Sequence, residues 1–300
     1  MVSIDEDRCT LCGLCIRVCL KGVLKEEEEN IVVIDPASCN LCGHCKAVCP
    51  ADAPKFSDLN EDEFEPTPDI DQLPDPVVFL RFLRHRRSQR IYKKKPVEIE
   101  KIRMIIEAGR FAPTGGNRQG CEYTVITGRK VLDRVCTLTI QTLQEQGKLV
   151  KDALDRYHRS KEPIPEEYVT MQYYPSLVDR LAEKWKQGTD ELLYHAPVLI
   201  LIHVRQGLTS TPQVDASLSA THMILMAETL GLGTCINGFI SFALNHSKEL
   251  REVLEIPPDH QVHVAFTLGY SDVEFLRLVA RNPAKIKWIG ELSGKNPILH

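Results

Sequence analysis

This sequence has no long hydrophobic run, no dominant sign of charge and few aromatic residues. Its longest strongly apolar stretch, residues 196–202, is far shorter than the roughly 20 residues that span a bilayer. The formal net charge of −4 gives no overall reason to expect binding to nucleic acid or to an anionic membrane. We recognise no signal peptide, so we expect a cytoplasmic protein whose thiols stay reduced.

Cysteine is scarce over most of the chain and concentrated at its start. Eight of the 11 cysteines lie in the first fifty residues, as two copies of the pattern C-x2-C-x2-C-x3-C. This spacing is typical of [4Fe–4S] ligands, because short gaps let a loop turn three thiolates inward while the fourth reaches the other cluster. One predicted cluster is held by Cys9, Cys12, Cys15 and Cys49, and the second by Cys39, Cys42, Cys45 and Cys19.

Disulfides, structural zinc and unpaired core thiols fit these eight cysteines less well. Disulfides need an oxidising compartment, and structural zinc usually takes four ligands in two separated pairs. Unpaired core cysteines would not repeat in this pattern. The remaining Cys121, Cys136 and Cys235 have no paired spacing, and we expect them to be buried apolar residues.

Charge and proline content divide the chain into two modules. Residues 59–76 contain seven acidic residues, four prolines and no basic residue, a composition that predicts an extended linker. Residues 81–95 then hold eight Lys and Arg residues and no acid. We therefore predict a small module over 1–58, an acidic Pro-rich linker over 59–76 and a larger module over 77–300.

The larger module mixes helical and strand patterns without a strict βαβ rhythm, which favours an α+β layered domain. We expect helices over 77–87, 97–111 and 215–230, the last packed closely on every side and open to contact with a second subunit. Expected strands cover 121–127, 197–204, 235–240 and 262–268. Tyr and Trp residues at irregular spacing within 136–188 either pack between helices or cover a substrate site as a lid.

The basic segment has three interpretations from the residues alone. A solvated charged face is the default, and a nucleic-acid patch is possible but disfavoured. The third is a phosphate site in residues 86–90, where guanidinium groups and a hydroxyl converge within one turn. A Pro/Gly-rich loop over 112–119 and a Gly-rich stretch over 231–238 follow along the chain, and residues 281–283 add another guanidinium.

These motifs resemble those of two known families. Residues 1 to about 57 resemble the bacterial two-cluster ferredoxins, and residues 77–290 resemble the FMN-dependent nitroreductase family. The second resemblance depends on RRSQR, APTGGN, HAPVLILIHV, AETLGLGTC and RNP, in that order. Together they imply an α+β protein, with a small ferredoxin-like two-cluster domain followed by a nitroreductase-type sandwich domain, and an intimate homodimer with FMN at the subunit interface.

The second resemblance also implies which residues contact FMN. Contacts to its phosphate and ribityl chain are expected from Arg86, Arg87, Ser88, Arg90 and Arg281. Thr114, Gly115 and Asn117 are expected to approach the flavin from the partner subunit, and Ile236, Asn237 and Gly238 to lie near its reactive nitrogen. Some members have an acidic residue in place of Asn237, and no Asn matches the flavin-ring contact that some members have before Tyr194.

We therefore predict an FMN-dependent oxidoreductase in which two [4Fe–4S] clusters pass single electrons to FMN. The reduced flavin then reduces a small organic acceptor, such as a nitroaromatic, a quinone or an activated alkene. The chemistry belongs to the cofactor, so no catalytic side chain is predicted. The donor to the clusters is an external ferredoxin or NAD(P)H. One alternative is NAD(P)H oxidation with electrons leaving through the clusters, and another is a non-catalytic relay or redox sensor.

Overall fold

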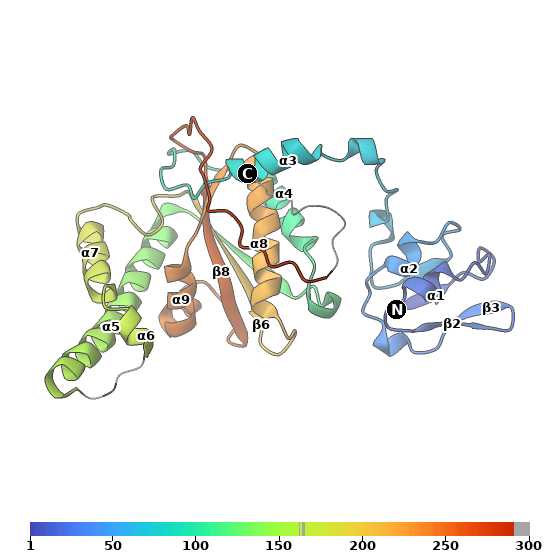
Figure 1. Ribbon diagram of the computed structural model, residues 1–300, viewed down its shortest axis with the longest axis horizontal. Helices are drawn as coiled ribbons and strands as arrows, with labels where there is room; N and C mark the ends of the chain where they lie inside the picture. Colours follow the sequence, from blue (N-terminus) through green and yellow to red (C-terminus); the bar gives the residue numbers. More distant parts are fainter. Residues whose placement is uncertain (162, 164–165, 291–300) are drawn as a thin grey trace.

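The structure, a computed structural model, describes residues 1–161, 163 and 166–290. An N-terminal module lies at one end of the long axis, and a connecting segment leads from it to α3 (Pro76–His85) at the edge of the larger module (Figure 1). The last ten residues of the predicted 77–300 module lie outside the described residues.

Two small two-stranded sheets and two short helices form the N-terminal module. Strand β1 (Val2–Ile4) pairs antiparallel with β4 (Pro54–Phe56), and β2 (Leu24–Glu27) pairs antiparallel with β3 (Asn30–Val33). Helices α1 (Leu14–Val18) and α2 (His44–Ala47) follow equivalent positions of the two cysteine repeats, and a 3-10 turn, η1 (Pro36–Ser38), lies before the second repeat. The buried apolar core of this module is small, so covalent or metal crosslinks must contribute to its stability.

The acidic segment does not run fully extended. It contains two 3-10 turns, η2 (Glu61–Glu63) and η3 (Ile70–Gln72). The ring of Phe64 stacks on Phe56 at 6.0 Å between centroids, and the Glu61 carboxylate pairs with the buried Lys46 ammonium at 2.7 Å. The first part of this segment therefore contacts the N-terminal module. The predicted boundaries at 58 and 76 stay predictions.

A four-stranded antiparallel sheet organises the larger module, in the order β5-β6-β8-β7. Its strands are β5 (Cys121–Thr127), β6 (Val198–Arg205), β7 (Gly233–Ile236) and β8 (His260–Gly269). Both faces of β6 are buried: Ile200 and Ile202 join one apolar cluster, and Leu199 and Leu201 join the cluster on the opposite face. The apolar run in the sequence is thus explained by a central strand covered on both sides.

Helices cover both faces of this sheet, which makes the module an α+β sandwich. The helices other than α3 are α4 (Ile99–Arg110), α5 (Arg129–Ser160), α6 (Glu166–Thr170), α7 (Tyr174–Lys186), α8 (Pro212–Thr229), α9 (Gly238–His246) and α10 (Lys248–Val253), with a 3-10 turn, η4 (Gly115–Asn117). Apolar side chains of α4 and α8 belong to one core, and those of α5, α9 and α10 to the other. Helix α7 packs along α5.

Helices α4 and α8 approach very closely at Gly109. A β-carbon built on Gly109 would lie 2.7 Å from the Met223 side chain and 2.9 Å from the Ser219 hydroxyl oxygen. The Ser219 hydroxyl donates to the Gly109 carbonyl oxygen at 3.1 Å. This contact fixes the end of α4, and hence the 112–119 loop that follows it, against α8.

The structure differs from the expectation for residues 235–240, which were predicted as one strand. Strand β7 ends at Ile236 and α9 begins at Gly238. The side-chain oxygen of Asn237 accepts from the Ile240 backbone N–H at 3.2 Å, so Asn237 caps the helix. The apolar run over residues 235–240 fits either a strand or a buried helix, and the capping bond of Asn237 favours the helix.

The sequence predicts that the 215–230 helix is packed closely on every side. Within a single chain, only one face of this helix is buried. Ala216, Ala220 and Met223 are buried against the sheet and α4, whereas Val214 and Leu218 remain exposed. Helix α3 has no buried residue, although it carries the predicted apolar stripe. Within the described residues, no helix combines the length and the apolar character that crossing a bilayer requires.

Removing the largest buried side chain of β8 should destabilise the larger module. Phe266 is fully buried, so we expect Phe266→Ala to lower the free energy of unfolding by about 3–5 kcal/mol. Urea unfolding of the full chain, followed by circular dichroism, measures this. The control Tyr157→Ala removes a more exposed aromatic near the end of α5 and should cost less than about 1 kcal/mol. Equal losses in the two variants would contradict the assignment of the core.

Candidate functional site

The eight clustered cysteines line two separate cavities in the N-terminal module. Cys9, Cys12, Cys15 and Cys49 line one cavity, and Cys19, Cys39, Cys42 and Cys45 line the other. The fourth cysteine of each repeat therefore lies with the first three of the other repeat. This is the arrangement in which two interleaved repeats would hold two metal clusters.

The two repeats share one backbone conformation. Leu11 and Leu41 have left-handed φ values of 55° and 53°, and Gly13 and Gly43 have φ values of 69° and 72°. Such a φ costs a non-glycine residue roughly 1–2 kcal/mol, so the leucines hold it only because the surrounding loop demands it. A turn of this shape points the first three cysteines of each repeat toward one cavity. The donor set and the loop geometry fit iron–sulfur ligation.

Burial changes the acidity of these thiols unequally. It raises the pKa of Cys45 to about 11 and also raises the pKa of Cys15, with further contributions from neighbouring cysteines. Cys12 and Cys42 are exposed. Ligand thiols bind metal as thiolates, so the buried thiols must lose their protons when metal binds.

A second candidate site is built around the basic segment in the larger module. Arg86 and Arg281 line one cavity, together with Arg84 and the apolar residues Leu83, Val279 and Ala280. No carboxylate lines this cavity, and within the described residues none of its three arginines forms an ion pair with a carboxylate. Unpaired guanidinium groups facing one cavity favour the binding of an anion with several oxygens.

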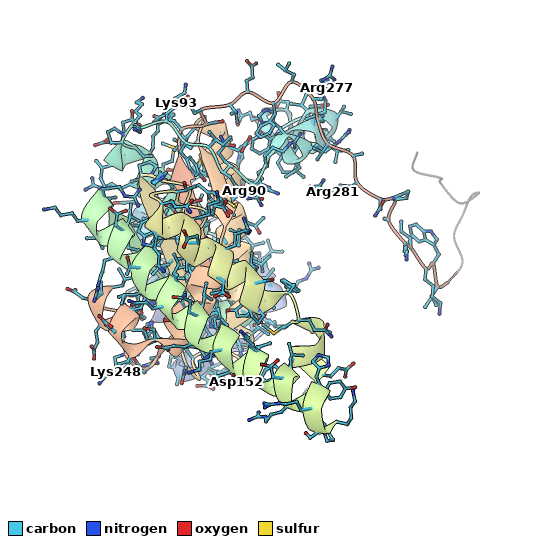
Figure 2. All side chains as sticks on the ribbon, turned by 90° about the vertical axis from the view of Figure 1, so that its left-hand side faces the viewer. Arg90, Lys93, Asp152, Lys248, Arg277 and Arg281 are labelled. Carbon is cyan, nitrogen blue, oxygen red and sulfur yellow. The ribbon has the colours of Figure 1, made fainter. Side chains whose placement is uncertain are left out.

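Ser88 and Arg90 lie beside strand β7. Ser88 forms an isolated parallel bridge with Thr234, and the Gln89 backbone N–H donates to the Thr234 carbonyl oxygen at 2.8 Å. The Arg90 guanidinium lies 5.9 Å from the centre of the Tyr194 ring. Figure 2 shows Arg90 on the body of the module and Arg281 on the C-terminal segment.

Arg87 is directed differently from its neighbours. Its guanidinium donates to the carbonyl oxygens of Arg84, His85 and Arg86 at 2.7–3.1 Å and to that of Arg277 at 3.0 Å. It lines a different cavity from Arg86, with Gln89 and Glu228. Arg87 thus caps the end of α3 and fastens the C-terminal segment to it. A role in holding a phosphate stays a prediction for this residue.

The predicted flavin contacts at the end of β7 differ in how far they are buried. Ile236 is exposed, whereas Asn237 is buried and donates from its side-chain nitrogen to the Leu192 carbonyl oxygen at 2.6 Å. With its oxygen capping α9, both ends of the Asn237 amide are used. Burial raises the pKa of Cys235, and the nearby Arg90 acts in the opposite direction. Cys235 is therefore a buried thiol, as expected.

The 112–119 loop forms a third group of predicted contacts. The Gly115 backbone N–H donates to the Asp215 carboxylate at 3.0 Å, and a β-carbon on Gly115 would meet the Thr209 and Thr211 hydroxyl oxygens at 2.7–2.8 Å. The Thr114 hydroxyl oxygen accepts from the Gln119 backbone N–H at 2.9 Å. Close approach to the two threonines that precede α8 therefore explains the glycine at position 115.

The structure does not bring the loop and the basic segment together within one chain. Asp215 lies in the first turn of α8, whereas Glu228, which pairs with His85 at 2.6 Å, lies in its last turn. At 1.5 Å per residue, these two positions are about 20 Å apart along the helix. One chain therefore cannot enclose a small ligand between Thr114–Asn117 and Arg86–Arg90.

A buried carboxylate outside all the predicted motifs positions Tyr194 beside Arg90. Asp190 accepts from the backbone N–H groups of Leu192, Leu193 and His195 at 2.7–3.0 Å. Tyr194 and His195 both have left-handed φ, so these bonds hold a strained turn before β6. Asp190 looks like any acidic residue in the sequence, because only the folded chain reveals its three donors.

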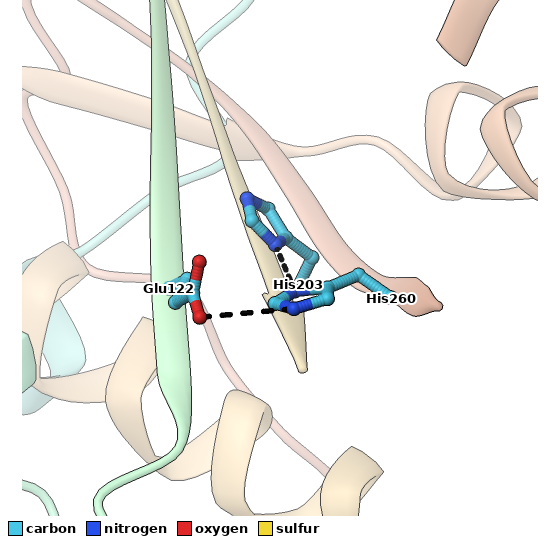
Figure 3. Close-up of side chains that lie close together, drawn as sticks. All are labelled: Glu122, His203 and His260. Atoms are coloured by element: carbon cyan, nitrogen blue, oxygen red, sulfur yellow. Dashed lines mark hydrogen bonds and ion pairs between the residues drawn. The ribbon is translucent and has the colours of Figure 1, made fainter. Parts of the chain in front are cut away.

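Two histidines and a glutamate meet on neighbouring strands, as Figure 3 shows. The Nδ1 atoms of His203 and His260 are 2.8 Å apart, and His260 Nε2 lies 3.7 Å from the Glu122 carboxylate. Their ligand atoms lie within 4.8 Å of one another, which is compatible with a metal ion. The hydrogen bond between the rings, and one from His203 Nε2 to Thr124 at 3.0 Å, already satisfy this group. Burial lowers the pKa of His203, and the neighbouring His260 acts in the same direction.

Part of the aromatic region between residues 136 and 188 packs in the interior. Tyr174 is buried in a cluster with Leu143 and Val178, and the Trp185 ring nitrogen donates to the Thr137 hydroxyl at 3.2 Å. Tyr173 is exposed, as is Tyr157 to a lesser degree. Residues 162, 164 and 165 of this region lie outside the described residues.

Comparison with known proteins gives two family matches. A model described as "Nitroreductase family" matches residues 83–270, and one described as "4Fe-4S dicluster domain" matches residues 1–50. The chain is 24% identical to the chloronitrobenzene nitroreductase of Comamonas testosteroni over 202 residues, which cover 63% of this chain and 85% of that protein. It is 26% identical to the 4-nitrobenzoate reductase of a Nocardioides species, with 67% of this chain and 84% of that protein covered.

A solved structure has the same fold as the larger module. Oxidized iodotyrosine deiodinase, bound to FMN and 3-iodo-L-tyrosine, superposes with a TM-score of 0.50 at 16% identity, covering 70% of this chain and 98% of that one. At this identity the likeness concerns the fold alone.

The unequal thiol acidities predict unequal alkylation of the iron-free protein. At pH 8 we expect iodoacetamide to modify Cys42 much faster than Cys45, because only the thiolate reacts and Cys45 has a pKa of about 11. The rate at Cys45 should rise about tenfold per pH unit up to that pKa. Peptide mass spectrometry measures both rates, and urea-unfolded protein is the control. Equal rates in the folded protein would contradict the burial of Cys45.

Proposed function

Since this chain belongs to the nitroreductase family and is an oxidoreductase, we propose that it binds FMN between two copies of itself and reduces a small organic acceptor. We propose further that its N-terminal module holds two [4Fe–4S] clusters and supplies the electrons. The single observation on which the proposal depends is the cavity of Arg84, Arg86 and Arg281, whose positive charge has no carboxylate partner among the described residues.

The charge of this cavity fits the phosphate of FMN. Two or three guanidinium groups supply paired N–H donors to phosphate oxygens, and the Ser88 hydroxyl and Arg90 lie next along the chain. Bound flavin would supply electron-pair chemistry and can accept electrons singly. The protein's own residues then act by binding and orienting it. Arg90 and the exposed Ile236 are proposed to lie along it, with Asn237 fixing the β7–α9 turn.

The exposed apolar surfaces support a homodimer. Helix α3 leaves Val77, Val78 and Leu80 more than half exposed, and α8 leaves Val214 exposed. Such apolar surface normally marks an interface. A second copy would also bring a 112–119 loop to the basic segment, which one chain cannot do. Members of this family are commonly dimers.

The relatives favour nitroaromatic compounds as the first acceptors to test. Two of them are named for the reduction of chloronitrobenzene and 4-nitrobenzoate. Quinones and activated alkenes accept electron pairs in the same way and belong in the same panel. We also propose a cytoplasmic location, because the clustered thiols would stay reduced there. No helix among the described residues could cross a membrane.

Loss of the two cavity arginines should release FMN. Each charge-assisted hydrogen bond contributes about 1.5–3 kcal/mol, so we expect Arg86→Ala/Arg281→Ala to weaken FMN binding on the order of 10²–10⁴-fold. Fluorescence titration of the flavin-free protein measures the dissociation constant. In the control, Arg134→Ala, the lost guanidinium pairs with Glu249 elsewhere on the surface, and FMN affinity should not change. Unchanged affinity in the double variant would reject this phosphate site.

The direction of electron flow is tested under argon with iron, sulfide and FMN restored. We expect a reduced ferredoxin to support 4-nitrobenzoate reduction, and expect the rate to fall at least tenfold in Cys42→Ser/Cys45→Ser. The matched control Cys121→Ser, a cysteine outside both cavities, should keep the rate. If NAD(P)H bleaches the flavin quickly and the cysteine variant is unaffected, electrons flow outward or bypass the clusters, and the proposed direction is wrong.

A further inference from the structure

The N-terminal module is docked on the 112–119 loop of its own chain. The Asn117 side-chain nitrogen donates to the Asn40 carbonyl oxygen at 2.9 Å, and the Asn40 side-chain nitrogen donates to the Gly116 carbonyl oxygen at 3.4 Å. An ion pair between Glu63 and Arg110 at 3.0 Å supports the same contact from the connecting segment. Asn40 directly follows Cys39, so the loop is bonded to a predicted cluster loop.

The two sets of cysteines are placed unequally with respect to this loop. A single cavity of about 350 Å³ is lined by Cys19, Cys39, Cys42 and Cys45 and also by Pro113, Thr114, Gly116 and Asn117. The cavity of Cys9, Cys12, Cys15 and Cys49 is lined only by residues of the N-terminal module. One cluster would therefore adjoin the larger module, and the other would be surrounded by the N-terminal module alone.

The loop that closes this cavity is also the loop that one chain cannot bring to its own basic segment. It is bonded to the start of α8 through Gly115 and Asp215, whereas Arg86 follows His85, which is paired at the end of α8. In the proposed dimer, the loop of one chain completes the flavin site whose phosphate is held by the other chain. The cysteines behind the loop then lie nearest to the flavin of the other chain.

We propose that the N-terminal module of each chain delivers electrons to the flavin anchored by the arginines of its partner, through the cluster of Cys19, Cys39, Cys42 and Cys45 and the adjoining 112–119 loop. This inference rests on the proposed function. Each transfer oxidises one reduced cluster by one electron. Two such transfers and one proton from water convert oxidised flavin to its reduced anion. A reduced small ferredoxin, a low-potential one-electron donor, returns each cluster to its reduced state.

Heterodimers with defects on chosen chains test this route. The flavin defect is Arg86→Ala/Arg281→Ala, and the cluster defect is Cys42→Ser/Cys45→Ser. Two affinity tags on co-expressed chains isolate one arrangement with the defects on different chains and one with both defects on the same chain. Each arrangement retains one FMN, and bleaching of its visible absorbance by reduced ferredoxin is followed in a stopped-flow instrument without acceptor. The homodimer with the cluster defect gives the background rate.

Delivery to the partner predicts opposite results for the two heterodimers. With the defects on different chains, bleaching should proceed at the wild-type rate per flavin. With both defects on one chain, it should fall to the background, because the intact cluster faces an empty flavin site. The reverse pattern would mean delivery within one chain, and equal rates would mean no preferred route; either overturns the inference. Full FMN in the arginine variant, or a monomer in solution, would instead reject the proposed function.

A second pair of variants tests the docking contact with all cofactors in place. Asn40→Ala/Glu63→Gln removes the bond to the Gly116 carbonyl oxygen and the ion pair with Arg110, while the Asn40 backbone carbonyl can still accept from Asn117. We expect this variant to keep its iron and FMN but to bleach the flavin more slowly than the wild type. The matched control is Glu107→Gln, which removes a partner of the same Arg110 within α4 and should bleach at the wild-type rate. Hydrogen exchange of the 112–119 loop, measured without any reductant, should rise in the double variant only. Unchanged bleaching despite faster exchange would overturn the role of the loop.

Discussion

The length and rigidity of α8 determine how this protein can work. The helix buries a face of small residues against the sheet and α4, and α4 fits against it only because position 109 has no β-carbon. At its start it holds the loop that faces the cysteine cavity, and at its end it holds the residues that precede the basic segment. Because a helix does not shorten, these two regions stay about 20 Å apart within one chain. A second chain is the simplest way to bring them together.

Much of the fold could be predicted from the sequence. Strand β5 matches its predicted range at both ends, and the predicted ranges of β6, β8, α4 and α8 differ by a few residues at each end. These elements have a strong periodicity or continuous apolar character. The apolar run after β7 was mistaken for a strand, because the capping bond of Asn237 depends on atoms that meet only in the folded chain. The 3-10 turn η2, which places Glu61 and Phe64 on the N-terminal module, escaped prediction for the same reason.

The sequence predicted some features of the candidate sites in more detail than others. Each cavity joins three cysteines of one repeat with the fourth of the other, which is the grouping that the cysteine spacing predicts; cluster ligation itself stays a prediction. The basic segment was predicted as one site, yet Arg87 faces backbone carbonyls while Arg86 faces a cavity. The directions in which these two neighbouring side chains point depend on where α3 ends. The periodicity of the sequence does not predict that end. The bond between Asn40 and Asn117 joins residues 77 positions apart, and nothing in either motif announces it.

The wall of the second cysteine cavity also has a consequence for biosynthesis. Its cysteines are complete when residue 45 has been made, whereas Pro113, Thr114, Gly116 and Asn117 follow more than sixty residues later. During synthesis the N-terminal module emerges first, so this cavity stands open to the iron-delivering machinery before the loop can cover it. Once α8 has folded and the loop has docked, access to the same cysteines is narrower. Iron that enters or leaves this cavity in the mature protein must therefore pass a wall that the newly made module lacks, whereas the other cavity is lined by the N-terminal module alone.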